Sequence, residues 1–470
     1  MKNKCFFVII SILFFFADTF CLFAEDAPVK GFRITKDTVL NVGIAIIPEY
    51  ESNITKASED TVSADTRKND GKEQHAGIIS DMILHYSPSL RIKLDDARKT
   101  IGFSMLFDYN HYLGLENSRT SKKLSELEIK SDFLGEFNKD GLVIFDFKNS
   151  LLRTATPDGQ ELSGKHKNLF DTFALGFAFK NVEDTLLGRI RLGVDLNYLE
   201  QSQDESAYRD YNYVSPSADF FGRWKFLPKT MAFFSVAARY HDYYESRIRS
   251  ASRSIPLNAF VGVEGQVSRY FSSKISAGYS VNIGHVVHHD YNANAEIVFK
   301  YNDLGAVLGY LRTMRPSAYY SYIASHKLYF NFKQKFAKYF LAAVSLNYSY
   351  LAFGKNMLYD ELDDYERQAD GSYQRVADSE TAGIVYTMLL PKGKRKDHLV
   401  VFTPSFSYAI LSWLGLRLAY TLEYRETGYF QKSTTRYAHN ADSGKNYTRT
   451  TDTHYDYMDH RVMLSIVLDY

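Results

Sequence analysis

The sequence predicts an all-β protein: a transmembrane antiparallel β-barrel of about eighteen strands, with sixteen or twenty as the alternatives. Three observations support this prediction. Apolar and polar residues alternate with a period of two from end to end, the alternating segments are long, and short connections alternate with long polar ones. A closed barrel pairs every backbone group without a membrane helix, so these features are expected together in a chain that crosses a membrane with strands.

Residues 1–24 have the features of a secretory signal peptide. A basic start, MKNK, precedes the apolar stretch CFFVIISILFFF, and the small residue Ala24 ends the segment. The alternatives are a retained anchor, for which the apolar stretch is short, and a lipoprotein at Cys21, which the large Phe20 disfavours. We therefore expect an exported chain with a short periplasmic segment, 25–37, before a barrel formed by residues 38–470.

The remainder of the chain has no cysteine and no net charge. Cys5 and Cys21 lie in the predicted leader, whose removal leaves 54 basic and 54 acidic residues. Extracellular eukaryotic domains usually carry disulfides, so a cysteine-free exported chain suits the outer membrane of a Gram-negative bacterium. The balanced charge gives no reason to expect nucleic acid as a partner.

The alternating segments are long enough to cross a membrane. In DMILHYSPSLRIKLDD, residues 81–96, every second residue from Met82 to Leu94 is apolar or aromatic, and the residues between include Arg91 and Lys93. A membrane strand needs about nine to eleven residues, whereas strands of soluble proteins average about five or six. Similar segments occupy residues 100–110, 186–200, 214–226, 257–267 and 414–424.

Short turns and long loops alternate along the chain. The short ones lie near Asp96, Asp140, Pro228, Ser272, Asn302 and Lys335. The long ones are 51–77, 114–125, 157–167, 201–210, 245–255, 353–380 and 431–455. This predicts short periplasmic turns and long extracellular loops. About nineteen segments have strand character, but an even number is needed if both ends are periplasmic. We assign residues 381–391 to an extracellular excursion with its own hairpin, which leaves about eighteen.

The last strand must close the barrel against the first, near residues 38–50. A terminal alternating strand that ends on an aromatic residue is typical of outer-membrane proteins that the barrel-assembly machinery recognises. Tyr470 departs from the commoner terminal Phe but keeps the aromatic ring. The predicted partners are this machinery and outer-membrane lipid, with periplasmic or surface envelope proteins as further candidates. The predicted assembly signal is Val462, Leu464, Ile466, Leu468 and Tyr470.

Two short stretches carry a resemblance to a known family. IIPEYESNIT, residues 46–55, has Tyr50, Glu51 and then Ser-Asn-Ile after the predicted first strand, and LSWLGLRLAYTLEYRETGY covers residues 411–429. Both resemble the outer-membrane β-barrel porin family that is associated with exopolysaccharide gene clusters. As a pattern the similarity covers most of the mature chain, but as residues it covers only these stretches. The resemblance implies a barrel linked to exopolysaccharide export, and its motifs do not specify a substrate.

About eighteen strands enclose a lumen wide enough for water, so the sequence favours a porin-like channel for hydrophilic solutes or exported polysaccharide. Basic residues on the inner face near the periplasmic end could favour anionic solutes. Alternatively, they pair with inward carboxylates and brace the wall. Inward tyrosines could stack on sugars or fill space. The basic residues are Arg91, Lys93, Arg189, Arg191, Arg223, Lys225, Lys333 and Arg417; the carboxylates are Asp132, Glu136, Asp146, Asp195, Asp219, Glu264 and Glu296; the tyrosines are Tyr213, Tyr243 and Tyr329.

The sequence is compatible with two other functions. Large loops with the acidic cluster Asp360, Glu361, Asp363, Asp364 and Glu366 would suit a receptor, adhesin or scaffold, and the cluster is either a divalent-cation site or a solvated loop. The segment HVVHHD, with His285, His288 and His289, would suit zinc or a general base in an outer-membrane hydrolase. On a strand, however, His288 would lie opposite the other two. We predict no catalytic residue, no metal site and no cofactor.

Overall fold

The computed structural model describes residues 32–54, 62–65, 73–75, 78–114, 126–157, 165–201, 212–244, 253–317, 320–337, 339–354, 365–367, 373–375, 384–389, 395–427, 430–438, 446–454 and 456–469. These ranges consist of strands, turns and short irregular connections. None of the described segments forms a helix with the length and apolar character needed to span a bilayer.

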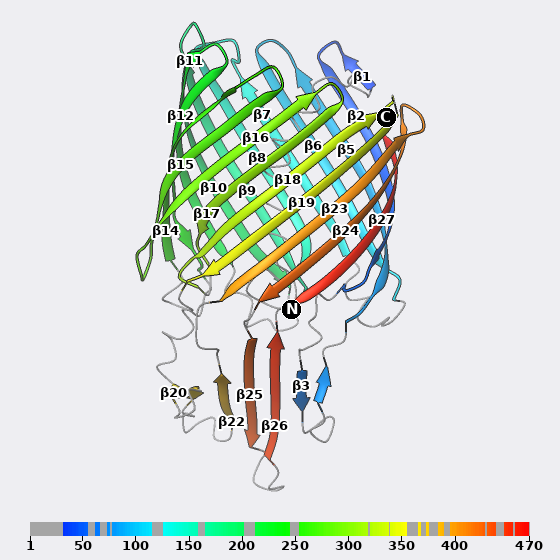
Figure 1. Ribbon diagram of the computed structural model, residues 1–470, viewed down its shortest axis with the longest axis vertical. Helices are drawn as coiled ribbons and strands as arrows, with labels where there is room; N and C mark the ends of the chain where they lie inside the picture. The colour runs from blue at the N-terminus through cyan, green and yellow to red at the C-terminus, as the bar shows by residue number, and fades with distance from the viewer. Residues whose placement is uncertain are drawn as a thin grey trace.

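Eighteen tilted antiparallel strands form a closed barrel (Figure 1). Two short strands, β12 and β13, count as one interrupted strand, because both pair with β11 and with β14. The predicted fold class and strand number are therefore confirmed. In chain order the strands are β2 (Thr38–Glu51), β5 (Asp81–Asp95), β6 (Lys99–Tyr112), β7 (Glu126–Phe137), β8 (Val143–Pro157), β9 (Lys165–Lys180), β10 (Leu186–Gln201), β11 (Tyr213–Leu227), β12 (Thr230–Arg239) with β13 (His241–Asp242), β14 (Arg253–Gln266), β15 (Phe271–Ile283), β16 (His288–Tyr301), β17 (Leu304–Arg315), β18 (Ile323–Phe336), β19 (Phe340–Phe353), β23 (Lys396–Ala409), β24 (Leu414–Thr427) and β27 (Tyr457–Asp469).

The barrel closes where the last strand meets the first, as predicted. β27 pairs with β24 on one side and with β2 on the other, with Ile46 opposite Ile466 and Tyr50 opposite Val462. The amide of Ser52 extends this pairing by donating to the carbonyl of His460 at 2.9 Å. The predicted signal residues Val462, Leu464, Ile466 and Leu468 lie on the outer face, whereas Tyr470 lies outside the described residues. Their role in assembly stays a prediction.

A short hairpin completes the edge of the first strand at the short-turn end. β1 (Phe32–Thr35) pairs with the start of β2, with Phe32 opposite Leu40. β27 pairs with β2 only from Gly43 onward, so β1 occupies the part of this edge that β27 does not reach. The predicted periplasmic segment 25–37 therefore contributes a strand, which the sequence analysis did not anticipate.

Turns at the short-turn end are tight. Four of the described non-glycine residues have positive φ, Asn138 (59°), Asp184 (50°), Asn302 (50°) and Ala337 (53°), and each lies between two consecutive barrel strands at this end. Asn and Asp tolerate this left-handed region better than other non-glycine residues. At the other end, three of the predicted long loops contain strands that form a second sheet.

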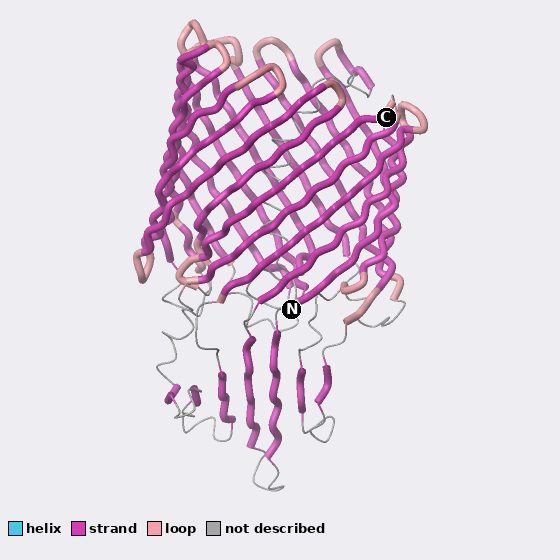
Figure 2. Tube along the Cα trace, viewed as in Figure 1, coloured by secondary structure: helices cyan, strands magenta, loops and turns pink. Residues whose placement is uncertain are grey.

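The second sheet has seven strands in the spatial order β4-β3-β26-β25-β22-β21-β20. It lies beyond the long-loop end of the barrel (Figures 1 and 2). The sequence predicted loops at 51–77 and 431–455 and an excursion with its own hairpin. A hairpin is present in the excursion as β20 and β21, but β22 also pairs with β25 and β26 pairs with β3, so the three segments form one sheet. The strands are β3 (Val62–Asp65), β4 (Glu73–His75), β20 (Tyr365–Arg367), β21 (Tyr373–Arg375), β22 (Ile384–Leu389), β25 (Phe430–Ala438) and β26 (Asn446–His454).

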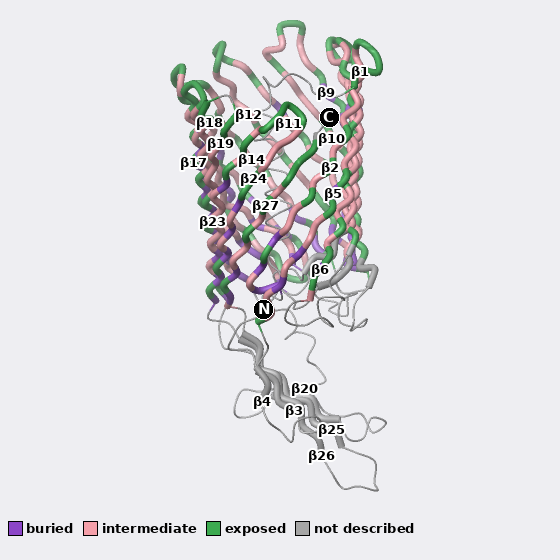
Figure 3. The backbone as a smooth tube through the Cα atoms, turned by 90° about the vertical axis from the view of Figure 1, so that its right-hand side faces the viewer, coloured by how far each residue is buried: buried purple, intermediate pink, exposed green. Residues whose placement is uncertain are grey.

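The two faces of the barrel wall differ in chemistry. Outward residues such as Leu192, Val261 and Ile275 are apolar and more than half exposed. Exposure of large apolar side chains over a whole surface fits lipid, not water. Inward positions carry Ser, Asn and charged residues, and the buried ones (purple in Figure 3) gather toward the long-loop end.

Candidate functional site

The inner wall of the barrel is the candidate site, because it holds the charged residues singled out in the sequence. The strand register puts all eight predicted basic residues on the face opposite the outward apolar residues, in the half nearer the short turns. Arg91, Lys93 and Arg417 are exposed there, and the others are half-buried. Whether they line an open pore stays a prediction.

Half of these basic residues brace the wall through ion pairs. Arg191 Nη2 lies 2.7 Å from Asp146 Oδ1. Lys93 Nζ lies 2.8 Å from Asp95 Oδ2. Arg223 and Lys225 share one carboxylate, that of Asp184, at 3.3 and 2.8 Å. The bracing alternative therefore holds for these four, although Asp95 and Asp184 were not among the carboxylates predicted to do it.

Arg91 and Arg417 keep their charge exposed to solvent, whereas Arg189 is half-buried. Among the described residues, no carboxylate lies within ion-pair distance of Arg91, Arg189 or Arg417. The guanidinium of Arg189 lies 5.5 Å from the ring centroid of Phe221, which is close enough for a cation–π contact. The inner wall near the periplasmic end is thus a mixture of neutralised pairs and exposed cations.

The predicted carboxylates mostly use partners that the sequence analysis missed. Asp195 pairs with Arg239 at 3.0 Å, and Glu264 pairs with Lys274 at 3.6 Å. Asp132 accepts a hydrogen bond from Ser150 at 2.6 Å. Glu264–Lys274 and Asp132–Ser150 join neighbouring strands, and Asp195–Arg239 spans β11 between β10 and β12, so these pairs could be found only once the strand register was known. Glu136 and Asp219 also lie on the inner face.

Asp184 has a special position in the turn between β9 and β10. Asn181 fixes this turn, because its Oδ1 accepts hydrogen bonds from the amides of Thr185 and Leu186 at 2.8 and 2.9 Å. The hydrogen bond from Lys225 lowers the pKa of the Asp184 carboxyl below its usual range. The carboxylate consequently stays ionised at neutral pH and screens two inward cations.

The long-loop end of the inner wall is different, because its charges are buried. Asp397, Glu423 and Asp459 are fully buried, and so are Arg395 and Arg425. Arg395 Nε lies 3.1 Å from Asp397 Oδ1, and Arg425 pairs with the other oxygen of that carboxylate. This buried charge cluster spans β23, β24 and β27. Desolvated charges are retained only when they are paired, so the cluster holds these strands in one arrangement.

Asp459 extends the cluster across the seam of the barrel. It accepts hydrogen bonds from the Asn53 amide at 3.2 Å and from the Ser52 hydroxyl at 3.3 Å, and Arg461 Nε lies 3.3 Å away. Ser52 and Asn53 belong to the IIPEYESNIT stretch. Ile54, which follows them, packs in an apolar cluster with Ile83 and Tyr112. These polar residues therefore tie the first strand to the last.

Apolar side chains are buried at the same end of the inner wall. Ile323, Leu351, Phe353 and Leu399 are each no more than 2% exposed. Arg395 lies over the Phe353 ring, with 4.5 Å from its guanidinium to the ring centroid. Water reaches the charged side chains near the short turns but not these residues. Along β18, β19, β23, β24 and β27 the inner wall is thus wet at its periplasmic end and dry at its outer end, whereas Arg239 at the loop end of β12 remains exposed.

The predicted lumen tyrosines fill space in the wall. Tyr213 and Tyr243 are buried and pack edge to face at 5.5 Å between ring centroids. Tyr329 is buried as well and donates to Glu296 at 2.6 Å. Of the two interpretations of these residues, packing fits their burial and sugar stacking does not.

The three histidines of residues 285–289 do not converge. His288 lies on the inner face, 4.6 Å from the Tyr322 ring. His289 lies on the outer face, where its Nδ1 is 2.7 Å from the Tyr279 hydroxyl. Within the described residues, no three His, Cys, Asp or Glu side chains are grouped so as to hold a metal ion. Of the acidic cluster, Glu366 lies in β20, whereas Asp360, Glu361, Asp363 and Asp364 lie outside the described residues.

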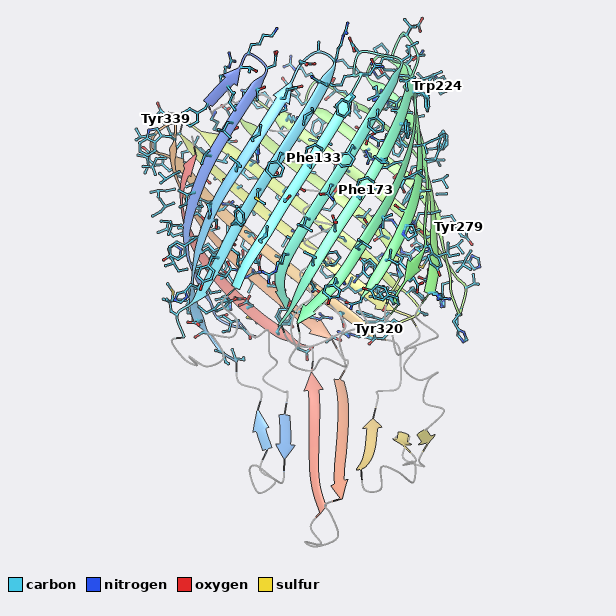
Figure 4. The ribbon with its side chains drawn as sticks, turned by 180° about the vertical axis from the view of Figure 1, so that it is seen from behind. Phe133, Phe173, Trp224, Tyr279, Tyr320 and Tyr339 are labelled. Atoms are coloured by element: carbon cyan, nitrogen blue, oxygen red, sulfur yellow. The ribbon has the colours of Figure 1, made fainter. Side chains whose placement is uncertain are left out.

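The outer surface completes the architecture. Aromatic residues lie at both ends of the apolar band, with Trp224 and Tyr339 at the short-turn end and Tyr279 nearer the long loops (Figure 4). A closed barrel with an apolar exterior, a polar interior, short turns and long loops has the architecture of the outer membrane. The chain is an outer-membrane β-barrel.

No protein-family model and no curated protein matches this sequence. Among solved structures, OccK3 (OpdO) of Pseudomonas aeruginosa matches with 10% identity and a TM-score of 0.41 over 92% of this chain and 96% of that chain. OpdK of Pseudomonas aeruginosa, determined with vanillate, matches with 9% identity and a TM-score of 0.40 over 92% and 99%. The siderophore receptor PirA of Acinetobacter baumannii matches with 8% identity and a TM-score of 0.42 over 93% and 81%. The assignment above rests on the strand pairing and surfaces of this chain itself.

Replacing Asp459 by asparagine tests the buried charge cluster. D459N keeps the shape of the side chain but leaves the Arg461 guanidinium without one of its two carboxylates, so we expect a loss of about 3 kcal/mol in the free energy of unfolding. The measurement is urea unfolding of the refolded barrel, followed by heat-modifiable gel mobility. D140N, at an exposed turn carboxylate with a 3.9 Å pair, is the matched control, and we expect it to stay within about 0.5 kcal/mol of the parent. Equal stability of D459N and D140N would contradict a structural role for the cluster.

Proposed function

We propose that this barrel is a porin-like channel for hydrophilic solutes, with a preference for anions. The observation that carries the proposal is the wet, charged half of the inner wall. Apolar side chains face lipid, whereas exposed cations such as Arg91 and Arg417 face the lumen. Exposed charges inside a narrow wet channel focus the electric field on the passing solute.

The dry outer end makes the channel asymmetric. Most of the residues named there lie on strands that lead into the seven-stranded sheet, namely β19, β23, β24 and β27, and Ile323 lies on the neighbouring β18. We therefore propose that passage requires rearrangement at the outer end while the periplasmic end stays open. An exported polysaccharide entering from the periplasm would meet the wet half first. This direction agrees with the resemblance of residues 46–55 and 411–429 to the exopolysaccharide-associated porin family.

A surface receptor, adhesin or scaffold is the second candidate. The seven-stranded sheet supports it, because three separate loops combine there into one body beyond the membrane (Figure 1). Loops that only connect strands would not need to pair with one another. In this candidate the barrel anchors the sheet, and the buried charge cluster holds the base of the loops in place.

Single-channel recording distinguishes the candidates. Residues 25–470, refolded and inserted into a planar bilayer, should give discrete conductance steps with a reversal potential on the anion side in a salt gradient. Replacing residues 430–454 by a short linker removes β25 and β26 and should raise the open probability. If heat-modifiable gel mobility shows that the barrel is folded but neither the parent nor the linker variant conducts ions, the channel proposal is contradicted and the receptor is favoured.

The selectivity can be tested at Asp184. D184N removes the charge that screens Arg223 and Lys225 and keeps a residue that tolerates positive φ, so the anion-to-cation permeability ratio should rise on the order of twofold. Because the pKa of Asp184 is lowered, the difference in this ratio between the parent and D184N should persist from neutral pH down past the ordinary Asp value of about 3.9, where other inward carboxylates lose their charge in both proteins. The difference from D184N should vanish only as the pH falls through the lowered pKa. D140N is again the control. An unchanged ratio in D184N at neutral pH would mean that these cations do not face the permeation path.

A further inference from the structure

The membrane-facing surface carries a repeated side-chain pair that no function described so far uses. In four hairpins a tyrosine hydroxyl lies within hydrogen-bond distance of a histidine Nδ1, at 2.7 to 2.9 Å. We call these four pairs the Tyr–His belt. They are Tyr279–His289, Tyr310–His326, Tyr348–His398 and Tyr420–His460.

The four pairs share one geometry. In each, the tyrosine lies on the strand that runs toward an extracellular loop, and the histidine lies on the strand that returns from it. Tyr310 is opposite Leu328, and His326 is two residues nearer the loop on the same outer face. Tyr348 and His398 have the same offset, since Tyr348 is opposite Val400. The repetition over consecutive hairpins, β15–β16, β17–β18, β19–β23 and β24–β27, indicates a common purpose.

Each Tyr–His hydrogen bond leaves one proton of the pair, on the hydroxyl or on the ring, that this bond does not use. His326 illustrates this, because its Nε2 accepts from Arg312 Nε at 3.1 Å. The proton of a neutral His326 is then on Nδ1 and is donated to the Tyr310 oxygen, which leaves the Tyr310 hydroxyl proton free to donate outward. In the other tautomer, the tyrosine donates to Nδ1, and Nε2–H becomes the outward donor. Polar groups at a lipid-facing surface are costly unless a partner meets them.

Charged groups accompany the belt. Arg312 lies over the Tyr291 ring, 3.5 Å from guanidinium to centroid, and its Nη1 is 2.6 Å from Asp290 Oδ1. Lys396 is exposed two residues before His398 on the same face, and Glu426 is opposite His398. Two cations, two carboxylates and the paired rings thus form a band with many donors and acceptors but little net charge.

Among the described residues, the belt occupies the hairpins from β15 to β27, and outside it the outward rings of Tyr109 and His111 on β6 stack with 6.2 Å between their centroids. The described residues of β8 and β9 carry a different outward polar set: Arg153 donates to the Leu127 carbonyl at 2.8 Å, and Asn149 donates to Asp171 at 2.7 Å. A girdle that only positions a barrel in the bilayer would be expected all round it. A one-sided band suits the binding of a particular headgroup.

We propose that the Tyr–His belt binds the headgroup of an outer-leaflet glycolipid that carries both phosphate and hydroxyl groups. Phosphate oxygens accept from the histidine or tyrosine donors and from Lys396, and sugar hydroxyls supply donors to the remaining acceptors. Sugar rings also pack on aromatic faces such as that of Tyr279, which projects from the outer surface (Figure 4). Two of the four pairs, Tyr348–His398 and Tyr420–His460, lie on hairpins whose loops contribute strands to the seven-stranded sheet. A bound glycolipid would therefore support the base of that sheet.

Native mass spectrometry of the refolded barrel, residues 25–470, tests this proposal. The probe is lipid A with two phosphates, and the comparison lipids are dephosphorylated lipid A and phosphatidylcholine. We expect the parent to retain phosphorylated lipid A in preference to both. The variant Y279F/Y310F/Y348F/Y420F loses four hydroxyl groups and should bind it about tenfold more weakly, which is a modest sum of neutral hydrogen bonds.

The matched control is Y270F/Y301F/Y339F/Y408F, which removes four hydroxyl groups at the short-turn end and should bind like the parent. Heat-modifiable mobility establishes folding, and Y310F alone and H398Q/H460Q replace the quadruple variant if it does not fold. Equal binding by belt and control variants, or equal retention of the dephosphorylated lipid, would overturn the proposal. Displacement by millimolar inorganic phosphate would also overturn it, because the site would then recognise a free anion.

Discussion

The structure depends on one constraint: every backbone amide and carbonyl within the membrane needs a partner inside the chain. The pairing of β27 with β2 meets it by removing the last free edges. The seam is not held by backbone hydrogen bonds alone. Asp459 receives hydrogen bonds from Ser52 and Asn53, so the first and last strands are joined through buried polar side chains at the outer end. β1 covers the remaining edge of β2 at the other end.

Closure divides the wall into surfaces with separate roles. The outward face contacts lipid, so it is apolar and carries the Tyr–His belt near the loops. The inner face near the short turns contacts water, and its charges remain exposed or pair at the surface at little energetic cost. Near the loops the inner charges are buried in pairs, and such pairs give specificity of arrangement at a cost in desolvation. The same cluster that closes the wall therefore also fixes where the three long loops begin, and these loops build the seven-stranded sheet.

The sequence predicted the barrel well because a period of two is a local property of the chain. The outward faces of β5, β10 and β24, the short turns and the closure by the last strand all follow from it. Pairings between distant residues did not follow. Tyr348 and His398 are fifty residues apart, and Arg191 meets Asp146 only through the strand register. The polar strands β25 and β26 lie in a segment that the sequence predicts to be a loop, because FQKSTTRYA and NYTRTTDTH lack apolar alternation. When strands from different loops pair with one another, the local sequence of each strand does not indicate its partner.

The central claim is that the inner wall is wet at the periplasmic end and dry at the outer end. Residues 25–470 contain no cysteine, so single cysteines can be labelled with a membrane-impermeant maleimide in vesicles of known orientation. R91C should react quickly from the periplasmic side, S349C on the inner wall near the loops should react slowly from either side, and V261C on the lipid face should not react. Rapid reaction of S349C from the outside would contradict the claim, because the lumen would then be open to water through the outer end.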